Sequence, residues 1–164
     1  MQIGTYRTVT ATPAAADQLA EIRLAAMRPS LQAAGRFDPQ RARDRFLRSF
    51  NPRETEVIFH EETIVGFYVV RSRSDHLFLD HLYIVPEFQG HGIGRAVIDT
   101  LKDQARSQGL RIRLMALNGS PANAFYQNLG FTVVSVDALD TILEWCADRG
   151  ADGASRAGRD ERMI

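Results

Sequence analysis

Cysteine is almost missing from this sequence, since Cys146 is the only one among 164 residues. A single cysteine excludes an internal disulfide framework, and it excludes a zinc cluster made from several cysteines. Charge of one sign is not in excess either, because 20 basic residues balance 20 acidic ones. This balance gives no reason to expect a nucleic acid or an anionic membrane surface as a partner.

Long apolar runs are missing as well. No segment approaches the length that spans a membrane, and the first residues lack the basic and then apolar pattern of a secretion signal. We therefore expect a cytoplasmic protein without a membrane partner. Residues 1–146 are long enough for a single domain with a substantial core. Residues 147–164 are rich in glycine, arginine and aspartate, so we expect a disordered tail there.

What the chain does contain is an alternation of strand and helix patterns, which indicates an α/β fold. Thr12-Pro13 and Asp38-Pro39 each place a capping side chain before a proline, which predicts two helix starts, and we expect Pro29 to end the first helix. Two further helices are predicted over residues 93–107 and 120–130. Apolar alternation and β-branched content predict strands over residues 6–9, 56–59, 63–70, 77–85, 110–117, 131–136 and 141–146.

The most informative segment is the run from Pro86 to Arg95, PEFQGHGIGR, between a predicted strand and a predicted helix. Gly90, Gly92 and Gly94 occupy alternate positions, where the missing Cβ frees the backbone to curl and to approach a ligand closely. The first N–H groups of a helix have no partner within it and, together with the helix dipole, they favour an anion. The segment therefore predicts a phosphate site, most simply for a pyrophosphate.

The same segment also fits an ordinary strand-to-helix turn that happens to use glycine. Two familiar phosphate loops are excluded by the residues around it. The Walker pattern requires lysine and then serine or threonine after its last glycine, whereas Gly94 is followed by Arg95 and Ala96. The dinucleotide fingerprint requires a third glycine where this chain has Val97.

What remains, Gln89-x-x-Gly92-x-Gly94, resembles the acyl-coenzyme A loop of the GCN5-related N-acetyltransferase (GNAT) superfamily. A second stretch is similar to the family's other signature: Asn118, followed by Ala124-Phe125-Tyr126 and Leu129-Gly130-Phe131. The resemblance covers residues 56–146. It implies a GNAT-like α/β fold, in which a mixed, mostly antiparallel sheet is flanked by helices and its central strands splay apart.

The resemblance implies acetyl-CoA as the acyl donor, held largely by main-chain groups. The loop amides would bind its pyrophosphate, with Gln89 as a brace, and its pantetheine arm would fill the gap between strands 77–85 and 110–117. Asn118 and Asn123 match positions that contact the coenzyme, and Asn118-Gly119 is also a good turn dipeptide. The expected cofactor-binding residues are Ile84, Val85, Gln89, Gly90, His91, Gly92, Ile93, Gly94, Arg95, Asn118, Asn123 and Tyr126.

Three residues are candidates for acid–base catalysis. Tyr126 matches the family's tyrosine beside the departing thiolate, which implies the acid role, although its pattern alone fits a core tyrosine on a short helix. Asp80 is the first choice for the base, because relatives often carry a carboxylate there. His81 is the second, because its ordinary pKa suits the task, and a water chain is the third. Adjacent strand residues face opposite sides, so we expect only one of Asp80 and His81 to face the substrate.

The remaining histidines, the cysteine and the arginines give weaker signals. His76 and His81 have no third ligand at metal-site spacing, so no metal is predicted. Cys146 lies in the last predicted strand, away from both motifs, which favours direct transfer in a ternary complex over an acyl-cysteine intermediate. Arginines around the second helix fit either an acidic-substrate wall or a solvated face: Arg36, Arg41, Arg43, Arg45, Arg48 and Arg53.

These observations predict an enzyme, an N-acetyltransferase that moves the acetyl group of acetyl-CoA to a primary amine. The acceptor stays open among a small molecule, a peptide and a protein. The alternatives are a catalytically silent acyl-CoA-binding module, against which Tyr126 argues, and a transferase of another acyl group. Strands 6–9 and 141–146, interpreted as sheet edges, offer contacts for a homodimer.

Overall fold

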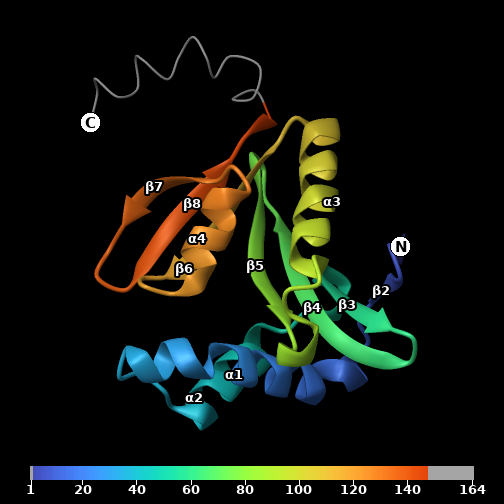
Figure 1. The fold of residues 1–164 in the computed structure, drawn as a ribbon, viewed down its shortest axis with the longest axis vertical. Coiled ribbons are helices and arrows are strands. Elements are labelled where there is room, and N and C mark those ends of the chain that lie inside the picture. Colours follow the sequence, from blue (N-terminus) through green and yellow to red (C-terminus); the bar gives the residue numbers. More distant parts are fainter. Residues whose placement is uncertain (1, 148–164) are drawn as a thin grey trace.

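A computed structural model describes residues 2–147 (Figure 1). Their strands form one eight-stranded sheet. The order across the sheet is β1-β2-β3-β4-β5-β6-β8-β7, and only β5 and β6 run parallel to each other. This mixed, mostly antiparallel sheet confirms the predicted fold class. The strands are β1 (Gln2–Ile3), β2 (Tyr6–Thr10), β3 (Thr55–His60), β4 (Thr63–Ser72), β5 (His76–Ile84), β6 (Arg111–Leu117), β7 (Thr132–Val136) and β8 (Asp140–Trp145).

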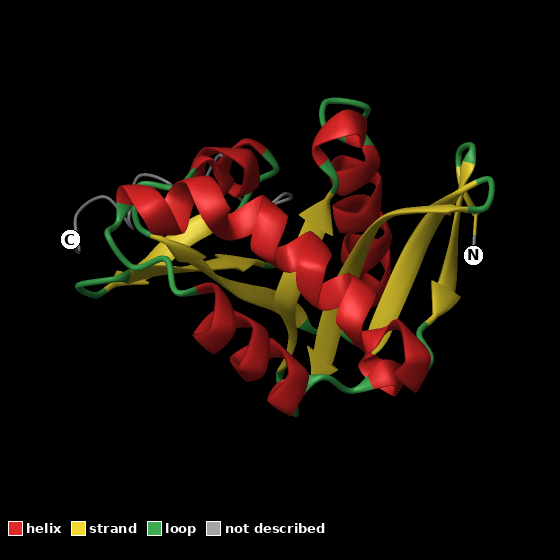
Figure 2. Cartoon of the chain, turned by 90° about the horizontal axis from the view of Figure 1, so that it is seen from below, coloured by secondary structure: helices red, strands yellow, loops and turns green. Residues whose placement is uncertain are grey.

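Helices cover both faces of the sheet (Figures 1 and 2). On one face α1 and α2 bury Leu19 and Phe46 in a core shared with Phe67 of β4. On the other face α3 and α4 share a second core with Tyr68, the next residue along β4, and with Val97 of α3. The division follows from the strand itself, because successive side chains point to opposite faces. The helices are α1 (Ala16–Ala33), α2 (Pro39–Ser49), α3 (Ile93–Gln108) and α4 (Pro121–Asn128).

The predicted helix signals near the N-terminus have different outcomes. Thr12-Pro13 begins only a short 3-10 turn, Pro13–Ala15, where the Thr12 side chain makes no capping hydrogen bond, and α1 follows at Ala16. Asp38 caps α2 as predicted, since its side chain accepts a hydrogen bond from the amide of Arg41 at 3.1 Å. The predicted end of α1 at Pro29 is wrong, because the helix continues to Ala33. Proline has no N–H, so the carbonyl of Ala25 lacks its usual intrahelical donor, and the helix accommodates this loss.

The sheet edges also differ from the prediction. Within residues 2–147 the outermost strands are β1 and β7. Residues 6–9 lie in β2, between β1 and β3, and residues 141–145 lie in β8, between β6 and β7. The expectation that these two segments are edges is therefore wrong. A two-residue strand such as β1 is too short to give a periodic pattern. The position of β7 outside β8 depends on tertiary packing, which local sequence does not show.

The central strands β5 and β6 separate after a short parallel stretch. Their register runs from His76 opposite Arg111 to Leu79 opposite Leu114. Beyond this point β5 continues along β4 as far as Ile84, whereas β6 continues along β8. The sheet therefore opens into a wedge, as the resemblance implied.

No helix within residues 2–147 is long and apolar enough to cross a bilayer. The predicted disordered tail lies outside the described residues except for Ala147.

Candidate active site

A cavity of about 770 Å³ lies in the wedge between β5 and β6. On the face covered by α3 and α4, its walls are the loop from Pro86 to Arg95 together with Phe125 and Tyr126, and we call this end the loop half. On the face covered by α1 and α2, α1 residues between Ala25 and Ser30 form the wall, and we call this end the helix half. The cavity thus passes through the sheet from one face to the other.

The loop half is built from main-chain groups. Gly90 and Gly92 have φ angles of 79° and 81°, in the left-handed region that glycine adopts without strain. Gly92 is the N-cap of α3, and its carbonyl accepts a hydrogen bond from the amide of Ala96 at 3.0 Å. Among the turn and cap hydrogen bonds of the described chain, none uses the N–H groups from Gly90 to Arg95. These donors are therefore available to an anion.

Two side chains hold the loop in this shape. Gln89 donates a hydrogen bond from Nε2 to the carbonyl of Ile84 at 2.9 Å, which ties the loop to the end of β5. Phe125 of α4 covers Gly94, where a Cβ would lie only 3.1 Å from the ζ carbon of the ring. Glycine at position 94 therefore permits the close approach of ring and loop. Sequence reasoning gave Phe125 no function of its own, and its place beside Tyr126 was the only signal.

Tyr126 lies on α4 at the border of the wedge. Its side chain packs against Phe125 and Phe131, with ring centroids 5.0 and 5.5 Å apart, and the residue is 8% exposed. Burial, followed by the nearby Tyr83, raises the pKa of Tyr126 above its ordinary value. The phenol is therefore protonated at neutral pH, and it can donate a hydrogen bond into the cavity.

A bulge in β5 brings Asp80 and His81 together in the helix half. Val69 lies opposite His81 and Val70 lies opposite Leu79, so Asp80 has no opposite residue in β4. The Oδ2 atom of Asp80 is 3.7 Å from Nε2 of His81, and both residues line the cavity. The expectation that only one of them faces this space is wrong, because it assumed a regular strand.

Arg71 of β4 fixes the position of the Asp80 carboxylate. Its Nε donates to Asp80 Oδ2 at 2.9 Å, its Nη1 to Glu54 Oε1 at 3.0 Å and its Nη2 to the carbonyl of Ser49 at 3.0 Å. Glu54 also accepts a hydrogen bond from Asn51 at 2.8 Å. The network joins the end of α2 to strands β4 and β5. Sequence reasoning missed Arg71, because nothing in its spacing from Asp80 marks the contact.

His81 and Tyr83 continue the row of polar groups beside Asp80. Nδ1 of His81 lies 3.4 Å from the hydroxyl of Tyr83, and its ring meets Phe46 edge-on at 5.4 Å. Burial, opposed by Asp80 and reinforced by Arg23, lowers the pKa of His81 to about 4. Burial also raises the pKa of Tyr83. At neutral pH this row therefore consists of a phenol, a neutral imidazole and an ion-paired carboxylate.

Most of the expected site residues line this cavity: Asp80, His81, Ile84, Gln89, Gly90, Gly92, Ile93, Gly94, Arg95 and Tyr126. Four described residues of the expected set do not: Val85, His91, Asn118 and Asn123.

The two asparagines make hydrogen bonds that hold the fold. Asn118 donates from Nδ2 to the carbonyl of Asp137 at 2.9 Å, and its Oδ1 accepts from the hydroxyl of Thr141 at 2.6 Å. Asn123 donates to the carbonyl of Leu117 at 2.9 Å. These bonds attach the β7–β8 turn and the start of α4 to the end of β6, beside the Asn118-Gly119 turn.

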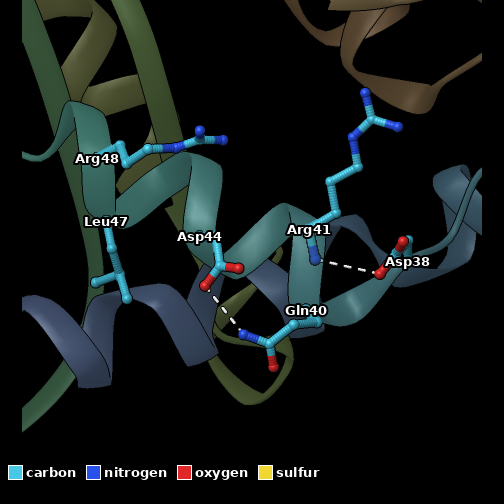
Figure 3. Close-up of a pocket in the computed structure, with 6 residues that line it drawn as sticks. All are labelled: Asp38, Gln40, Arg41, Asp44, Leu47 and Arg48. Atoms are coloured by element: carbon cyan, nitrogen blue, oxygen red, sulfur yellow. Dashed lines mark hydrogen bonds between the residues drawn. The ribbon is translucent and has the colours of Figure 1, made fainter.

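The arginines around α2 lie outside the central cavity. Arg43 pairs with Asp17 at 2.9 Å and also with Glu21, so it joins α2 to α1. The described residues contain no group of three or more His, Cys, Asp or Glu side chains that could hold a metal ion. Figure 3 shows a separate surface pocket, none of whose residues lines the central cavity: Asp38, Gln40, Arg41, Asp44, Leu47 and Arg48.

Three features occur together in this chain: central strands that splay apart, a glycine loop at the start of α3 and a cavity that passes through the sheet. Together they define a class of α/β proteins. The model of the acetyltransferase (GNAT) family matches residues 17–131, which is more than half of the chain. The chain therefore belongs to the GNAT family, as its two motifs implied. No curated protein matches the sequence.

Solved structures share the fold at low sequence identity. PaiA N-acetyltransferase from Thermoplasma acidophilum, solved in complex with coenzyme A, is 17% identical, with a TM-score of 0.71 over 86% of this chain and 98% of that one. An acetyltransferase from Thermus thermophilus is 21% identical, with a TM-score of 0.67 over 89% and 99%. The ribosomal-protein-S18-alanine N-acetyltransferase from Escherichia coli is 17% identical, with a TM-score of 0.65 over 86% and 93%. At these identities the likeness shows the fold alone.

Proposed function

We propose that this protein is an acetyl-CoA-dependent N-acetyltransferase that acts on a primary amine by direct attack in a ternary complex. The observation that carries the proposal is the single cavity through the sheet. It connects main-chain donors suited to a pyrophosphate, in the loop half, with a row of proton-accepting side chains in the helix half. Membership of the GNAT family supports acyl transfer from coenzyme A in general.

The loop half fits the coenzyme on physical grounds. Amides from Gly90 to Arg95 are free to bind an anion at the positive end of α3, and each hydrogen bond to a charged group contributes about 1.5–3 kcal/mol. Beyond Leu79 and Leu114 the two strands have no pairing across the wedge, so their main-chain groups can bond the amides of a pantetheine arm. The relative from Thermoplasma acidophilum, solved with coenzyme A, supports this assignment.

In the reaction, the amine nitrogen bonds to the thioester carbonyl carbon, and the bond from that carbon to sulfur breaks. At neutral pH an alkylamine arrives as the ammonium ion, so it gives one proton to a base before attack and the nitrogen gives up a second as the amide forms. One of these two protons ends on the departing sulfur, and the other leaves to solvent. Tyr126 is the proposed donor to the thiolate. Because the pKa of Tyr126 is raised, full proton transfer to a thiolate of pKa near 8.5 is uphill, so its contribution is chiefly a hydrogen bond to the developing charge.

Asp80, His81 or a water chain between them is the proposed base. Deprotonating an alkylamine of pKa near 10.4 at pH 7 costs about 4–5 kcal/mol, so the base needs a free lone pair near the nitrogen. His81 has a free lone pair at neutral pH, but a pKa lowered to about 4 makes it a weaker base than an ordinary histidine, so it passes the proton on rather than holding it. The expectation that the ordinary pKa of His81 suits the task is therefore wrong. The Asp80 carboxylate pairs with Arg71 and lies 3.7 Å from Nε2 of His81, so a proton can reach it through His81 or a water.

The test is calorimetric titration with acetyl-CoA of the wild-type protein and of the Gly92→Asp variant. A carboxylate at the loop repels the pyrophosphate, and we expect affinity to fall on the order of 100-fold, as for the loss of one or two charged hydrogen bonds. Gly109→Asp is the matched control, since Gly109 ends the same helix with φ of 65° and has equal space around a Cβ. The control should bind as wild type does.

Equal loss in both variants, or no binding by wild type near millimolar acetyl-CoA, would contradict the assignment of the loop. Release of free thiol with a panel of primary amines then separates an enzyme from a silent coenzyme-binding module. Binding without thiol release would favour the module.

A further inference from the structure

The helix half has apolar walls on two sides. From α1 come Met27 and Pro29, and from β6 come Met115 and Leu117. Along β6 the buried residues Ile112, Leu114 and Ala116 belong to the core under α3 and α4. The residues between them therefore point to the α1 side of the sheet.

Met115 is the exceptional residue of this wall. Although it is a long apolar side chain in a central strand, it is 50% exposed. An apolar group of this size beside a cavity is typical of a surface that contacts a ligand. Methionine also adapts its shape to different apolar partners.

Free charge is scarce in the cavity lining. Arg95, which belongs to the loop half, is the only arginine or lysine among its described lining residues, and the lining His81 is neutral at neutral pH. The only acidic one is Asp80, and its charge is paired with Arg71. Arg23 and Arg45 are close enough to His81 to act on it electrostatically, but neither lines the cavity. An acceptor with a carboxylate would lose solvation in the helix half without gaining a cationic partner from the lining.

Neutral polar groups in the helix half suit an amine. The Ala25 carbonyl lacks its intrahelical donor because of Pro29, and Ser30 adds a hydroxyl. Both can accept a hydrogen bond from an amine N–H.

We infer that the acceptor is a primary amine carried by an apolar, uncharged body, which packs between Met27 of α1 and Met115 of β6. This inference rests on the proposed N-acetyltransferase function and assigns Met115 as a specificity-determining residue. The walls disfavour an amine that carries an anionic group beside its apolar body.

The experiment compares phenethylamine with its para-carboxylate analogue, which differ by one charge. For the wild type we expect kcat/KM to favour phenethylamine by tenfold or more, about the size of effect that a single mismatched group has in a pocket. Met115→Arg should reduce this preference by about tenfold, because the new cation pairs with the carboxylate. The control is Val136→Arg on the exposed edge strand β7, outside the cavity, and it should keep the wild-type ratio.

Binding of both amines to the protein saturated with free coenzyme A, measured by calorimetry, separates the two proposals. Suppose that phenethylamine binds preferentially, but that no thiol is released when the same amine is supplied with acetyl-CoA. This result upholds the inference and overturns the transferase function. Equal or better binding and turnover of the carboxylate analogue overturns this inference, assigns the anion to Arg23 or Arg45, and leaves the transferase function standing. A Met115→Arg ratio equal to that of wild type also overturns it.

Discussion

The two halves of the cavity are built in different ways. The anion-binding part of the loop half comes from one contiguous segment, in which glycines expose amides at the start of α3. The helix half is lined by residues of α1, β5 and β6, and it is held by the bulge at Asp80 and by the contacts of Arg71 from β4. One half thus offers main-chain groups to a phosphate, and the other offers side chains to an acceptor.

This contrast teaches where variation is tolerated. Main-chain donors depend on backbone shape, so they require glycine at Gly90 and Gly92 and little else. A side-chain wall changes with every substitution in any of its elements. A coenzyme shared within a family therefore suits the loop half, whereas acceptor choice suits the helix half.

The largest expected effect comes from a comparison of Tyr126 and Tyr83, the two tyrosines that border the wedge. Tyr126→Phe removes the hydrogen-bond donor proposed for the thiolate, and we expect kcat to fall on the order of 100-fold, the lower end for acid–base groups. The dissociation constant for acetyl-CoA should stay within about threefold, since the loop amides carry that affinity. Steady-state kinetics and calorimetry measure the two quantities.

Tyr83→Phe is the counterpart in the helix half. Its hydroxyl contacts His81 rather than the loop, so we expect a raised KM for the amine and a smaller change in kcat than in Tyr126→Phe. If both variants lose kcat equally, the division of roles between the phenols is incorrect.

Much of the fold was predictable because local signals determined it. The side chain of Asp38 caps α2, and the loop from Gln89 to Gly94 adopts the shape that its glycines allow. Pro29 shows the limit of such signals, since tertiary packing of α1 outweighs one lost hydrogen bond. The outer strands were not predictable, because a two-residue β1 and the placement of β7 outside β8 leave no local pattern.

The candidate site shows the same division between features set by local sequence and features set by tertiary contacts. Sequence motifs located the loop half, including Tyr126, because its residues are contiguous or lie within one signature. In the helix half they found Asp80 and His81 but not their geometry, since a bulge depends on pairing between strands. Arg71 and Tyr83 gave no signal at all. Their roles follow from contacts with Glu54 and His81, which only the folded chain brings near.

The next largest effect concerns acid stability in the helix half. The pKa of His81 is lowered to about 4 in the folded protein, against about 6.5 in an unfolded chain. Above pH 6.5 both states are neutral and His81 makes no contribution. Between pH 6.5 and 4 the unfolded chain binds a proton that the folded state does not, so stability falls as pH falls, by up to about 3 kcal/mol.

His81→Gln should remove this loss and flatten the curve of unfolding free energy against pH in that window. Urea unfolding at intervals between pH 4 and 7 measures it. His91→Gln, in the exposed loop, is the control and should keep the wild-type slope. A slope unchanged in His81→Gln would contradict the assignment of the acid sensitivity to this histidine.

The smallest effect compares two arginines that each bridge two carboxylates. Arg71 is 14% exposed and its partners Asp80 and Glu54 are about three-quarters buried, whereas Arg43 bridges Asp17 and Glu21, which are mostly exposed. Arg71→Ala leaves two partly buried carboxylates unpaired, and we expect a loss of about 2 kcal/mol in unfolding free energy, below the 3–5 typical of full burial. Arg43→Ala should lose less than about 1 kcal/mol.

The same pair of variants also tests how the two halves of the cavity are coupled. Release of the Asp80 carboxylate in Arg71→Ala should raise the KM for the amine while the affinity for acetyl-CoA stays unchanged, because no contact of Arg71 reaches the loop. Arg43→Ala should alter neither. Acetyl-CoA affinity that falls together with amine affinity in Arg71→Ala would mean that the two halves respond as one unit, and that the wedge, rather than its separate walls, sets both preferences.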